Sequence, residues 1–357
     1  SEHLPEIIQM IGVLLEKGHA YCVGGDVYFS IDSFPEYGKL SGRSREEMLA
    51  GARVEVDERK RNPMDFALWK EAKPGEPSWD SPWGKGRPGW HIECSAMSLK
   101  YLGAGFDFHG GGTDLIFPHH ENEIAQSEAY SGQKFVRYWV HNAFITINNE
   151  RMGKSLGNYL TIRQVRNQYP PEVVRFFLLG THYRNPLNFG PEELQAAARG
   201  LERIRQAYKN WRFFLENTPV TSGPDILDLS VLVTEGKKKF IEAMSDDFNT
   251  PQAMAVIYDI IRAVNSTINN KNFHLTEKNK EALLSAIQIL EELAGTVLGL
   301  KLGSEEELDD KIQKMVDERQ RARAAKDWAT ADRIREELKA MGIVLEDTPQ
   351  GVRWRKI

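Results

Sequence analysis

The chain has 357 residues, of which 41% are hydrophobic and 27% are charged, and its 46 Lys+Arg against 51 Asp+Glu give a net charge of −5. This composition excludes a disordered, collagen-like or low-complexity protein and is typical of a globular chain with several domains. The sequence has no run of 18 or more apolar residues, so we expect no membrane span. Its two cysteines, Cys22 and Cys94, are too few for a disulfide framework and favour a cytoplasmic location.

The first third of the chain is predicted to mix helix, strand and turn. Apolar residues at helical spacing predict a helix within residues 1–22 that ends near Gly18, and residues 24–31 predict a turn and a strand. Residues 32–68 are rich in turns. Residues 70–90 are so dense in Pro, Gly and Trp that we expect a packed functional loop with few regular elements.

The remaining elements change character along the chain. Residues 91–150 alternate between predicted helices and strands, which is the pattern of a parallel α/β sheet: helices over 92–101 and 118–130, and strands over 107–109, 135–140 and 143–147. From Pro191 the chain is strongly helical, with a linker expected over 305–310 and a small hairpin over 343–357. The helices are expected from 191 onward and over 229–243, 250–269, 276–300 and 311–340.

The charge is unevenly distributed. Residues 131–214 carry 13 Lys/Arg and 5 Asp/Glu, so a basic block lies inside an acidic chain. Such a block is a candidate polyanion surface, and the alternative is an ordinary solvated helix face.

Histidines gather in one window with a cysteine. Five of the nine histidines lie between residues 91 and 141, together with Cys94. His119 and Glu123 are four residues apart on a predicted helix and share one face, and His120 is three residues from Glu123 and could also converge on it. Thiolate, imidazole and carboxylate together suit Zn²⁺, and a three-ligand site normally keeps an open position for water or substrate. The alternatives are chance spacing and a cysteine that only fills the core.

Two glycine-containing segments could bind anions. Residues 109–114, His-Gly-Gly-Gly-Thr-Asp, let the backbone approach a ligand closely, or form only a tight turn. Residues 151–158, Arg-Met-Gly-Lys-Ser-Leu-Gly-Asn, present Lys and Ser beside glycines and could bind phosphate oxygens, although the spacing is not that of a P-loop.

Several long motifs together resemble the cysteinyl-tRNA synthetase family, a class I aminoacyl-tRNA synthetase family. They span essentially the whole chain: residues 61–66, 89–97, 108–115, 117–127, 151–158, 326–328 and 345–351, with Trp354. The resemblance implies ATP-dependent activation of L-cysteine to cysteinyl-AMP and its transfer to tRNA-Cys.

The resemblance also implies roles for individual residues. Cys94, His119 and Glu123 match ligands of one Zn²⁺ per chain, which takes the substrate thiolate and thereby excludes serine. Trp90 and His109 match residues that line the cysteine pocket, and Asp114 matches the partner of the substrate ammonium.

The segment around Lys154 resembles the family's signature loop, whose usual form is KMSKSLGN. Arg151, Met152, Gly153, Lys154 and Ser155 are therefore expected to bind ATP, which is used with Mg²⁺, and Lys154 is the expected catalytic residue because it stabilises the adenylation transition state. Gly153 and Arg151 depart from the usual form, and we expect altered loop dynamics without loss of the chemistry.

The implied fold is α/β plus all-α. We expect a connective-peptide insertion over 1–68 and, over 69–150, a partial class I Rossmann-type parallel sheet with the zinc site. The signature loop and stem-contact segment follow over 151–195, the helical bundle over 196–302, and a small anticodon-binding module over 303–357. The family's HIGH motif and a fourth, cysteine zinc ligand are not found in these residues, so we expect a chain that begins inside the insertion and is inactive alone.

The last fifty residues are expected to recognise the anticodon. Residues 305–357 carry 12 Lys/Arg and 13 Asp/Glu, so hydrogen bonds and stacking, and not bulk attraction, are the expected means of recognition. The candidates are Arg323, Trp328, Asp332 and Asp347, with helix packing as the alternative for Trp328. We expect the full-length enzyme to be a monomer.

Two other functions stay open at this point. One is the cysteine ligase of the mycothiol pathway, which shares the adenylation core but lacks the anticodon module. The other is a non-catalytic protein that binds zinc or tRNA.

Overall fold

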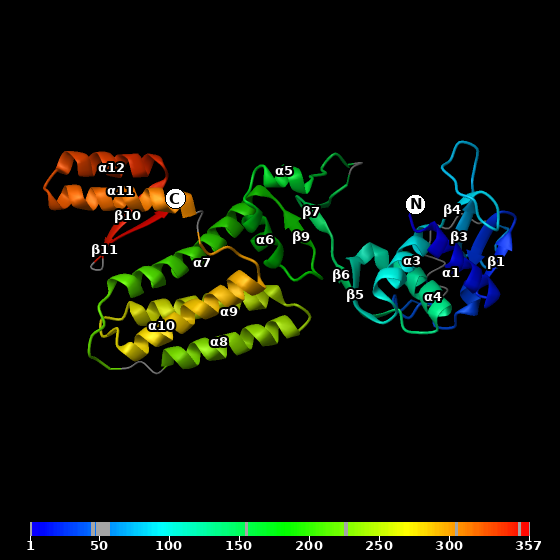
Figure 1. Cartoon of the computed structure of the whole chain (residues 1–357), viewed down its shortest axis with the longest axis horizontal. Coiled ribbons are helices and arrows are strands. Elements are labelled where there is room, and N and C mark those ends of the chain that lie inside the picture. The colour runs from blue at the N-terminus through cyan, green and yellow to red at the C-terminus, as the bar shows by residue number, and fades with distance from the viewer. Residues whose placement is uncertain are drawn as a thin grey trace. The chain divides into compact units, whose positions relative to one another are not determined.

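The computed structural model describes residues 2–43, 47, 58–153, 156–224, 228–303, 306–348 and 351–356, and within these it leaves out the side chains of 228–230, 232, 306–311, 347–348, 351, 353 and 355–356. The chain divides into two compact units, Ser1–Phe144 and Ile145–Ile357. Figure 1 shows the elements of each unit. Lys154 and Ser155 lie outside the described residues.

The first unit begins with a helix and an antiparallel sheet. Helix α1 spans Leu4–Glu16, starts with a proline in its first turn and buries an apolar face. Strands β1 (Ala20–Val23) and β2 (Asp26–Phe29) form a hairpin around two glycines, and β3 (Phe66–Glu71) and β4 (Gly86–Pro88) extend the sheet in the order β1-β2-β3-β4. Residues 70–90 contain the end of β3 and the short strand β4, in keeping with the few regular elements expected there, and most of β3 lies in the preceding segment that we expected to be rich in turns.

A βαβ unit forms the rest of the first unit. Helix α3 (Trp90–Leu102) precedes strand β5 (Phe106–Gly112), and after a short 3-10 turn and a π turn (Ile116–His120) comes helix α4 (Glu121–Ser131). Strand β6 (Val136–Asn142) pairs parallel to β5, with Phe106 opposite Val136 and Gly112 opposite Asn142. The parallel pair confirms the predicted α/β pattern, but the helix expected from residue 118 begins at Glu121.

Gly89 allows α3 to start directly against the antiparallel sheet. A Cβ at this position would lie 1.9 Å from the carbonyl oxygen of Ala67, so a larger residue would push the helix away from β3. The apolar residues of α1, the sheet, α3 and α4 form one core, which includes the fully buried Trp69 and Phe29. This core fixes the helices that carry the predicted metal ligands.

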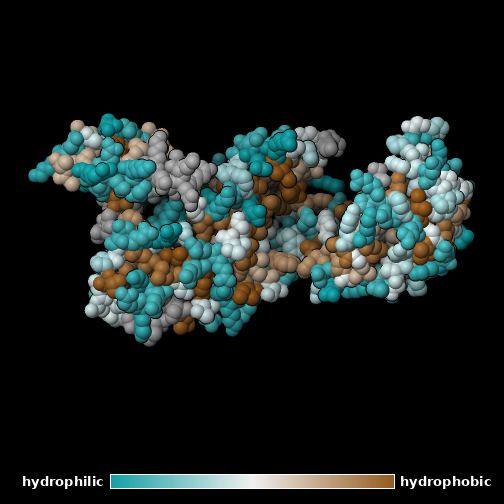
Figure 2. All heavy atoms as spheres, viewed as in Figure 1, coloured by the Kyte–Doolittle hydropathy of each residue, from teal (hydrophilic) through white to brown (hydrophobic). Residues whose placement is uncertain are grey.

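The second unit begins with a small sheet and short helices. Strand β7 (Ile145–Ile147) lies between β8 (Glu150–Arg151) and the parallel strand β9 (Leu187–Phe189). Helix α5 (Ile162–Arg166) starts at a capping box formed by Thr161 and Gln164, and α6 (Pro171–Leu179) follows it. Figure 2 shows hydrophobic side chains on the surface around α6 and β9.

A helical bundle forms the core of the second unit. Its helices are α7 (Pro191–Asn217), α8 (Asp228–Ser245), α9 (Thr250–Ile268) and α10 (Glu277–Leu290), and a π-helical segment, Glu291–Val297, continues α10. Trp211 of α7 is fully buried in this core and its indole N–H donates to Asn265 Oδ1 at 2.8 Å. The bundle agrees with the helical region predicted after Pro191.

The end of the chain is a helical hairpin followed by a β-hairpin. Helices α11 (Glu306–Ala324) and α12 (Trp328–Ala340) pack on strands β10 (Ile343–Thr348) and β11 (Gly351–Lys356) around a small core. The predicted linker over 305–310 is wrong for residues 306–310, which begin α11. The single helix predicted over 311–340 is divided at Lys326, which has a φ of 59°.

The fold confirms the predicted class: an α/β part with a parallel strand pair, a helical bundle and a small carboxy-terminal module. The proposed division at 68/69 falls inside β3, and the division at 150/151 falls inside β8, whereas the compact units divide between residues 144 and 145. Among the described residues, we find no helix that is long and apolar enough to cross a bilayer.

Candidate functional site

The three predicted ligands converge in the first unit. One ligand atom each of Cys94, His119 and Glu123 lies within 4.8 Å of the others. Cys94 lies on α3 and Glu123 in the first turn of α4, with His119 in the π turn just before it. The i, i+4 spacing of His119 and Glu123 brings His119 Nε2 within 2.8 Å of a Glu123 carboxylate oxygen.

A second set of side chains shares the same carboxylate. His109, His120 and Glu123 also have ligand atoms within 4.8 Å of one another, and His109 Nε2 lies 3.2 Å from the other Glu123 oxygen. Sequence spacing did not decide whether His119 or His120 is the ligand beside Glu123. The structure does not decide it either, because both imidazoles face Glu123. Cys94 belongs only to the set with His119.

Burial and the two imidazoles act in opposite directions on Glu123. This residue is fully buried, and burial alone would raise the pKa of its carboxyl, but contacts with His109 and His119 lower the pKa overall. The carboxylate is therefore ionised at neutral pH. Within the described part of the chain, neither of its oxygens receives a hydrogen bond of good geometry, because the nearby imidazole N–H groups are poorly aligned with them.

Burial favours the neutral form of the neighbouring thiol and of two neighbouring imidazoles. It raises the pKa of the Cys94 thiol to about 11, with further contributions from Glu123 and Glu93, and it lowers the pKa values of His91 and His120 to about 4. The imidazoles of His91 and His120 are therefore neutral at pH 7 and can each offer a lone pair to a cation. The thiol is protonated until an opposite charge binds beside it.

Other histidines surround the three predicted ligands. His91 Nδ1 lies 2.8 Å from His119 Nδ1, and His120 Nδ1 lies 2.8 Å from His141 Nε2. The side-chain N–H of Gln126 donates to the His91 carbonyl oxygen at 2.6 Å and so joins α4 to α3. The sequence showed the enrichment in histidine, but we assigned no role to His91 or His141, since only the tertiary packing reveals their contacts.

Two residues predicted for the cysteine pocket contact this cluster. The Trp90 ring is exposed by 59%, and its centroid lies 4.5 Å from that of His119. His109 contacts Glu123, as described above. Asp114 is exposed and lies in the short 3-10 turn after β5. Its carboxylate is so close to Gly112 that a Cβ at Gly112 would lie 2.4 Å from Asp114 Oδ1.

The predicted nucleotide loop lies in the second unit. Arg151 is exposed at the end of β8, and Met152 and Gly153 are half-buried. Asn158 holds this loop together: its side-chain oxygen accepts from the Gly153 N–H at 2.9 Å and its amide donates to the Arg151 carbonyl at 3.1 Å. The sequence pattern did not indicate this role for Asn158, although the residue ends the motif.

Three of the four predicted anticodon residues lie near the turn between α11 and α12, and the fourth lies in the β-hairpin. Trp328, the first residue of α12, is exposed by 59%, which disfavours the packing alternative for this side chain. Asp332 is exposed one turn further along α12, and Arg323 lies in the last turn of α11. Asp347 pairs with Val352 through the β-hairpin backbone, and its side chain lies outside the description. Trp354, which belongs to the matched carboxy-terminal motif, packs on the small core of this module. Lys209 Nζ lies 4.6 Å from its ring centroid.

Comparison with known families covers nearly the whole chain. Residues 1–199 match the model of the tRNA synthetases class I (C) catalytic domain, residues 239–303 match the DALR domain, and residues 305–355 match the cysteinyl-tRNA ligase anticodon binding domain. The match over residues 305–355 disfavours the mycothiol-pathway alternative, which lacks that module.

Individual relatives agree with the family models. A cysteine–tRNA ligase from Heliobacterium modesticaldum is 56% identical over all of this chain and 76% of its own length, and one from Pelotomaculum thermopropionicum is 53% identical with the same coverage. A structure of a putative arginyl-tRNA synthetase from Campylobacter jejuni, at 12% identity and a TM-score of 0.54, covers 85% of this chain and 62% of that one, and supports the fold alone. The chain belongs to the cysteine–tRNA ligase family of class I aminoacyl-tRNA synthetases.

Proposed function

We propose that this chain provides the cysteine-selecting and tRNA-binding parts of a cysteine–tRNA ligase, which activates L-cysteine with ATP and transfers it to tRNA-Cys. The observation that carries the proposal is the convergence of Cys94, His119 and Glu123 within a segment that matches the class I catalytic domain. A thiolate sulfur, an imidazole nitrogen and a carboxylate oxygen form a donor set suited to a borderline metal.

The residues fit one Zn²⁺. Glu123 is buried and ionised, yet among the described residues neither oxygen has a well-aligned hydrogen-bond donor, which is costly unless a cation also binds there. Cys94, His119 and Glu123 would hold the metal. When bound, the ion supplies a Lewis acid that prefers a thiolate to a hydroxyl oxygen, which distinguishes cysteine from serine.

The side chains around this site orient the amino acid. Trp90 provides an exposed aromatic side chain in contact with His119, and His109 provides an imidazole beside Glu123. Asp114 provides an exposed carboxylate for the substrate ammonium, which a charge-assisted hydrogen bond suits. These three residues therefore place the thiol and the amino group of the substrate.

The loop from Arg151 to Ser155 binds the ATP phosphates, which are accompanied by Mg²⁺. Lys154 stabilises the negative charge that develops when the adenylate forms, and Arg151 adds a second cation. Asn158 supports this role because its two hydrogen bonds join Gly153 to Arg151 and keep the described part of the loop compact.

The carboxy-terminal module recognises the anticodon. Trp328 offers an exposed ring for base stacking. Asp332 and Arg323 are near Trp328 in the sequence and offer hydrogen bonds to base edges. Asp347 is the fourth proposed contact. Location in the cytoplasm and a monomeric full-length enzyme stay predictions.

Zinc titration of the purified chain tests the metal part of the proposal. We expect one zinc per chain in the wild type, and a loss of affinity of at least tenfold in Cys94→Ser, His119→Gln and Glu123→Gln. His120→Gln and Cys22→Ser are the matched controls, expected to stay within a few-fold of the wild type. Equal losses in His119→Gln and His120→Gln would favour the second set of side chains.

Adenylate formation is tested separately. We predict that these 357 residues alone catalyse no ATP–pyrophosphate exchange, and clear exchange by the isolated chain would contradict this prediction. Binding of tRNA-Cys to the same preparation, compared with a tRNA of altered anticodon, tests the recognition role independently.

A further inference from the structure

Helix α4 carries different contacts on its two faces. Glu123, with His119 four residues earlier, faces the metal-ligand cluster. Glu121 lies two residues before Glu123 and therefore about 200° around the helix axis, on the opposite side. Glu128, seven residues after Glu121, returns to the same face as Glu121.

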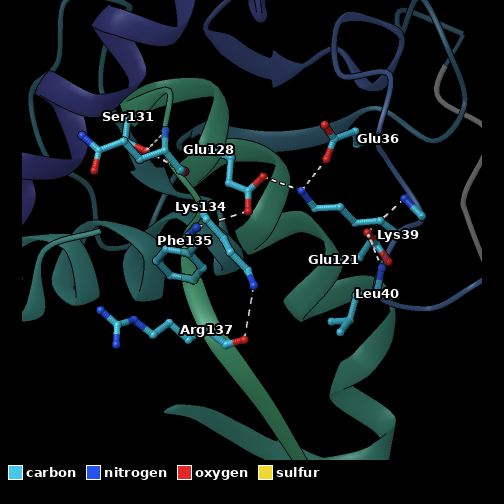
Figure 3. Close-up of polar contacts among 11 residues, drawn as sticks. Glu36, Lys39, Leu40, Glu121, Glu128, Ser131, Lys134, Phe135 and Arg137 are labelled. Carbon is cyan, nitrogen blue, oxygen red and sulfur yellow. Dashed lines mark hydrogen bonds and ion pairs between the residues drawn. The ribbon is translucent and has the colours of Figure 1, made fainter. Parts of the chain in front are cut away.

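The face opposite the cluster is bound to a segment that is distant in sequence. We name residues 36–41 the anchor segment. The Glu121 carboxylate is fully buried and accepts three backbone N–H groups from this segment: Gly38 at 2.9 Å and Leu40 at 3.4 Å on one oxygen, and Ser41 at 2.8 Å on the other. Figure 3 shows Glu121 beside Leu40 and Lys39.

Two further contacts extend this attachment along α4. The Tyr37 hydroxyl donates to Asn122 Oδ1 at 2.5 Å, in a buried position. Lys39 Nζ bridges Glu36 at 2.6 Å and Glu128 at 2.5 Å, as Figure 3 shows, but this bridge is partly exposed. Exposed ion pairs contribute little, so the buried contacts of Glu121 and Asn122 carry most of the attachment.

The start of α4 is not fixed by a local cap. The helix follows a kinked π turn in which Phe117 is extended, and among the described residues no side chain caps the N-terminus at His120. The Glu121 N–H donates to the carbonyl oxygens of Ile116 and Pro118 in that turn, so the backbone gives the first turn one local attachment. The side-chain contacts with the anchor segment add a second, long-range attachment to the turn that carries Glu123.

We propose that Glu121 is a positioning residue for the metal site: by accepting the anchor-segment N–H groups it holds the first turn of α4 so that Glu123 and His119 face Cys94. The proposal rests on the proposed zinc-binding function of these three residues. Glu121 itself does not contact the metal, because its carboxylate is bound to the anchor segment on the opposite face.

The test is zinc affinity, measured by competition with a chelator well below the unfolding temperature. Glu121→Gln keeps the side-chain volume but replaces one acceptor with an NH₂ group, which must then face the N–H of Gly38 or of Ser41. We expect a loss of zinc affinity of at least tenfold, the range seen when a partner behind the ligands is removed. We also expect faster hydrogen exchange at the amides of Gly38 and Ser41.

Glu128→Gln is the matched control, since it lies on the same face and loses the partly exposed ion pair with Lys39, whereas its amide oxygen can still accept the Phe135 N–H; we expect an affinity within twofold of the wild type. If Glu121→Gln does not fold, Tyr37→Phe replaces it, with an expected loss of at least threefold. Unchanged affinity in Glu121→Gln despite faster exchange at Gly38 and Ser41, or in Tyr37→Phe, would overturn the proposal.

Glu123→Gln in the same assay separates the two levels of inference. If Glu123→Gln keeps full affinity, the proposed metal ligands are wrong. If Glu123→Gln loses affinity while Glu121→Gln and Tyr37→Phe do not, the ligands stand and the positioning role of Glu121 fails.

Discussion

Lowering the pH should destabilise the metal-free first unit through its buried histidines. Burial lowers the pKa of His120 from 6.5 to about 4, although Glu123 acts in the opposite direction. Above pH 6.5 His120 is neutral in both the folded and the unfolded chain. As the pH falls from 6.5 to 4, the unfolded chain binds a proton that the folded chain does not, so stability is lost over this window.

The size of this loss follows from the two pKa values. At pH 5 a histidine shifted from 6.5 to about 4 reduces the free energy of unfolding by about 2 kcal/mol relative to pH 7. His91, whose pKa is also about 4, adds a similar amount. His120→Gln should therefore remove about half of the loss that these two histidines cause between pH 7 and pH 5.

Urea unfolding in the presence of a chelator measures this loss. Hydrogen exchange of the α4 peptide is the readout, so that the unfolding of the first unit alone is observed. The α4 readout is needed because a chain with two compact units need not unfold in one step. His182→Gln, in the second unit, is the control and should not alter the profile of α4. An identical loss between pH 7 and pH 5 in His120→Gln and wild type would refute the reasoning.

Three further predictions concern the thiol, the loop and the exposed tryptophan. Because the pKa of Cys94 is raised to about 11, metal binding must release the proton of its thiol. Zinc affinity should therefore rise about tenfold per pH unit near neutrality. Competition with a chelator measures this slope, and Cys94→Ser should reduce it. Asn158→Ala removes the bonds to Gly153 and Arg151, so limited proteolysis should cut within residues 151–158 faster than in wild type; equal rates would contradict the role of Asn158. Trp328→Ala should weaken tRNA-Cys binding by about 1–3 kcal/mol in a filter-binding assay, while the melting temperature stays unchanged because the side chain is exposed; unchanged binding would remove Trp328 from the interface.

Local sequence patterns predicted the elements that depend on local periodicity. The apolar face of α1 and the stripe of α7 repeat at helical spacing, and both helices form close to the expected residues. Strands β3 and β4 were missed because their order comes from pairing with β2 and with each other, and a composition rich in Pro, Gly and Trp hides such pairing. The division between α11 and α12 depends on one left-handed residue, Lys326, which periodicity does not reveal.

The candidate site shows the same limit. The spacing of His119 and Glu123 predicted their shared face, because four residues make about one helical turn. Spacing did not choose between His119 and His120, and the structure brings both to Glu123. The convergence of Cys94 from α3 depends on how α3 and α4 pack, and the resemblance to a family indicated it where periodicity could not. The contacts of His91 and His141 were predicted by neither, because they depend on the packing of α3, α4 and β6.

The central claim is that a metal held by Cys94, His119 and Glu123 selects a thiol. Cobalt(II) substitution tests it directly, since cobalt occupies zinc sites and a cobalt–thiolate bond absorbs strongly in the near ultraviolet. We predict a thiolate band from Cys94 in the cobalt-loaded chain and a further increase when L-cysteine is added, but none with L-serine. A spectrum without a thiolate band, or an equal response to L-cysteine and L-serine, would contradict the account.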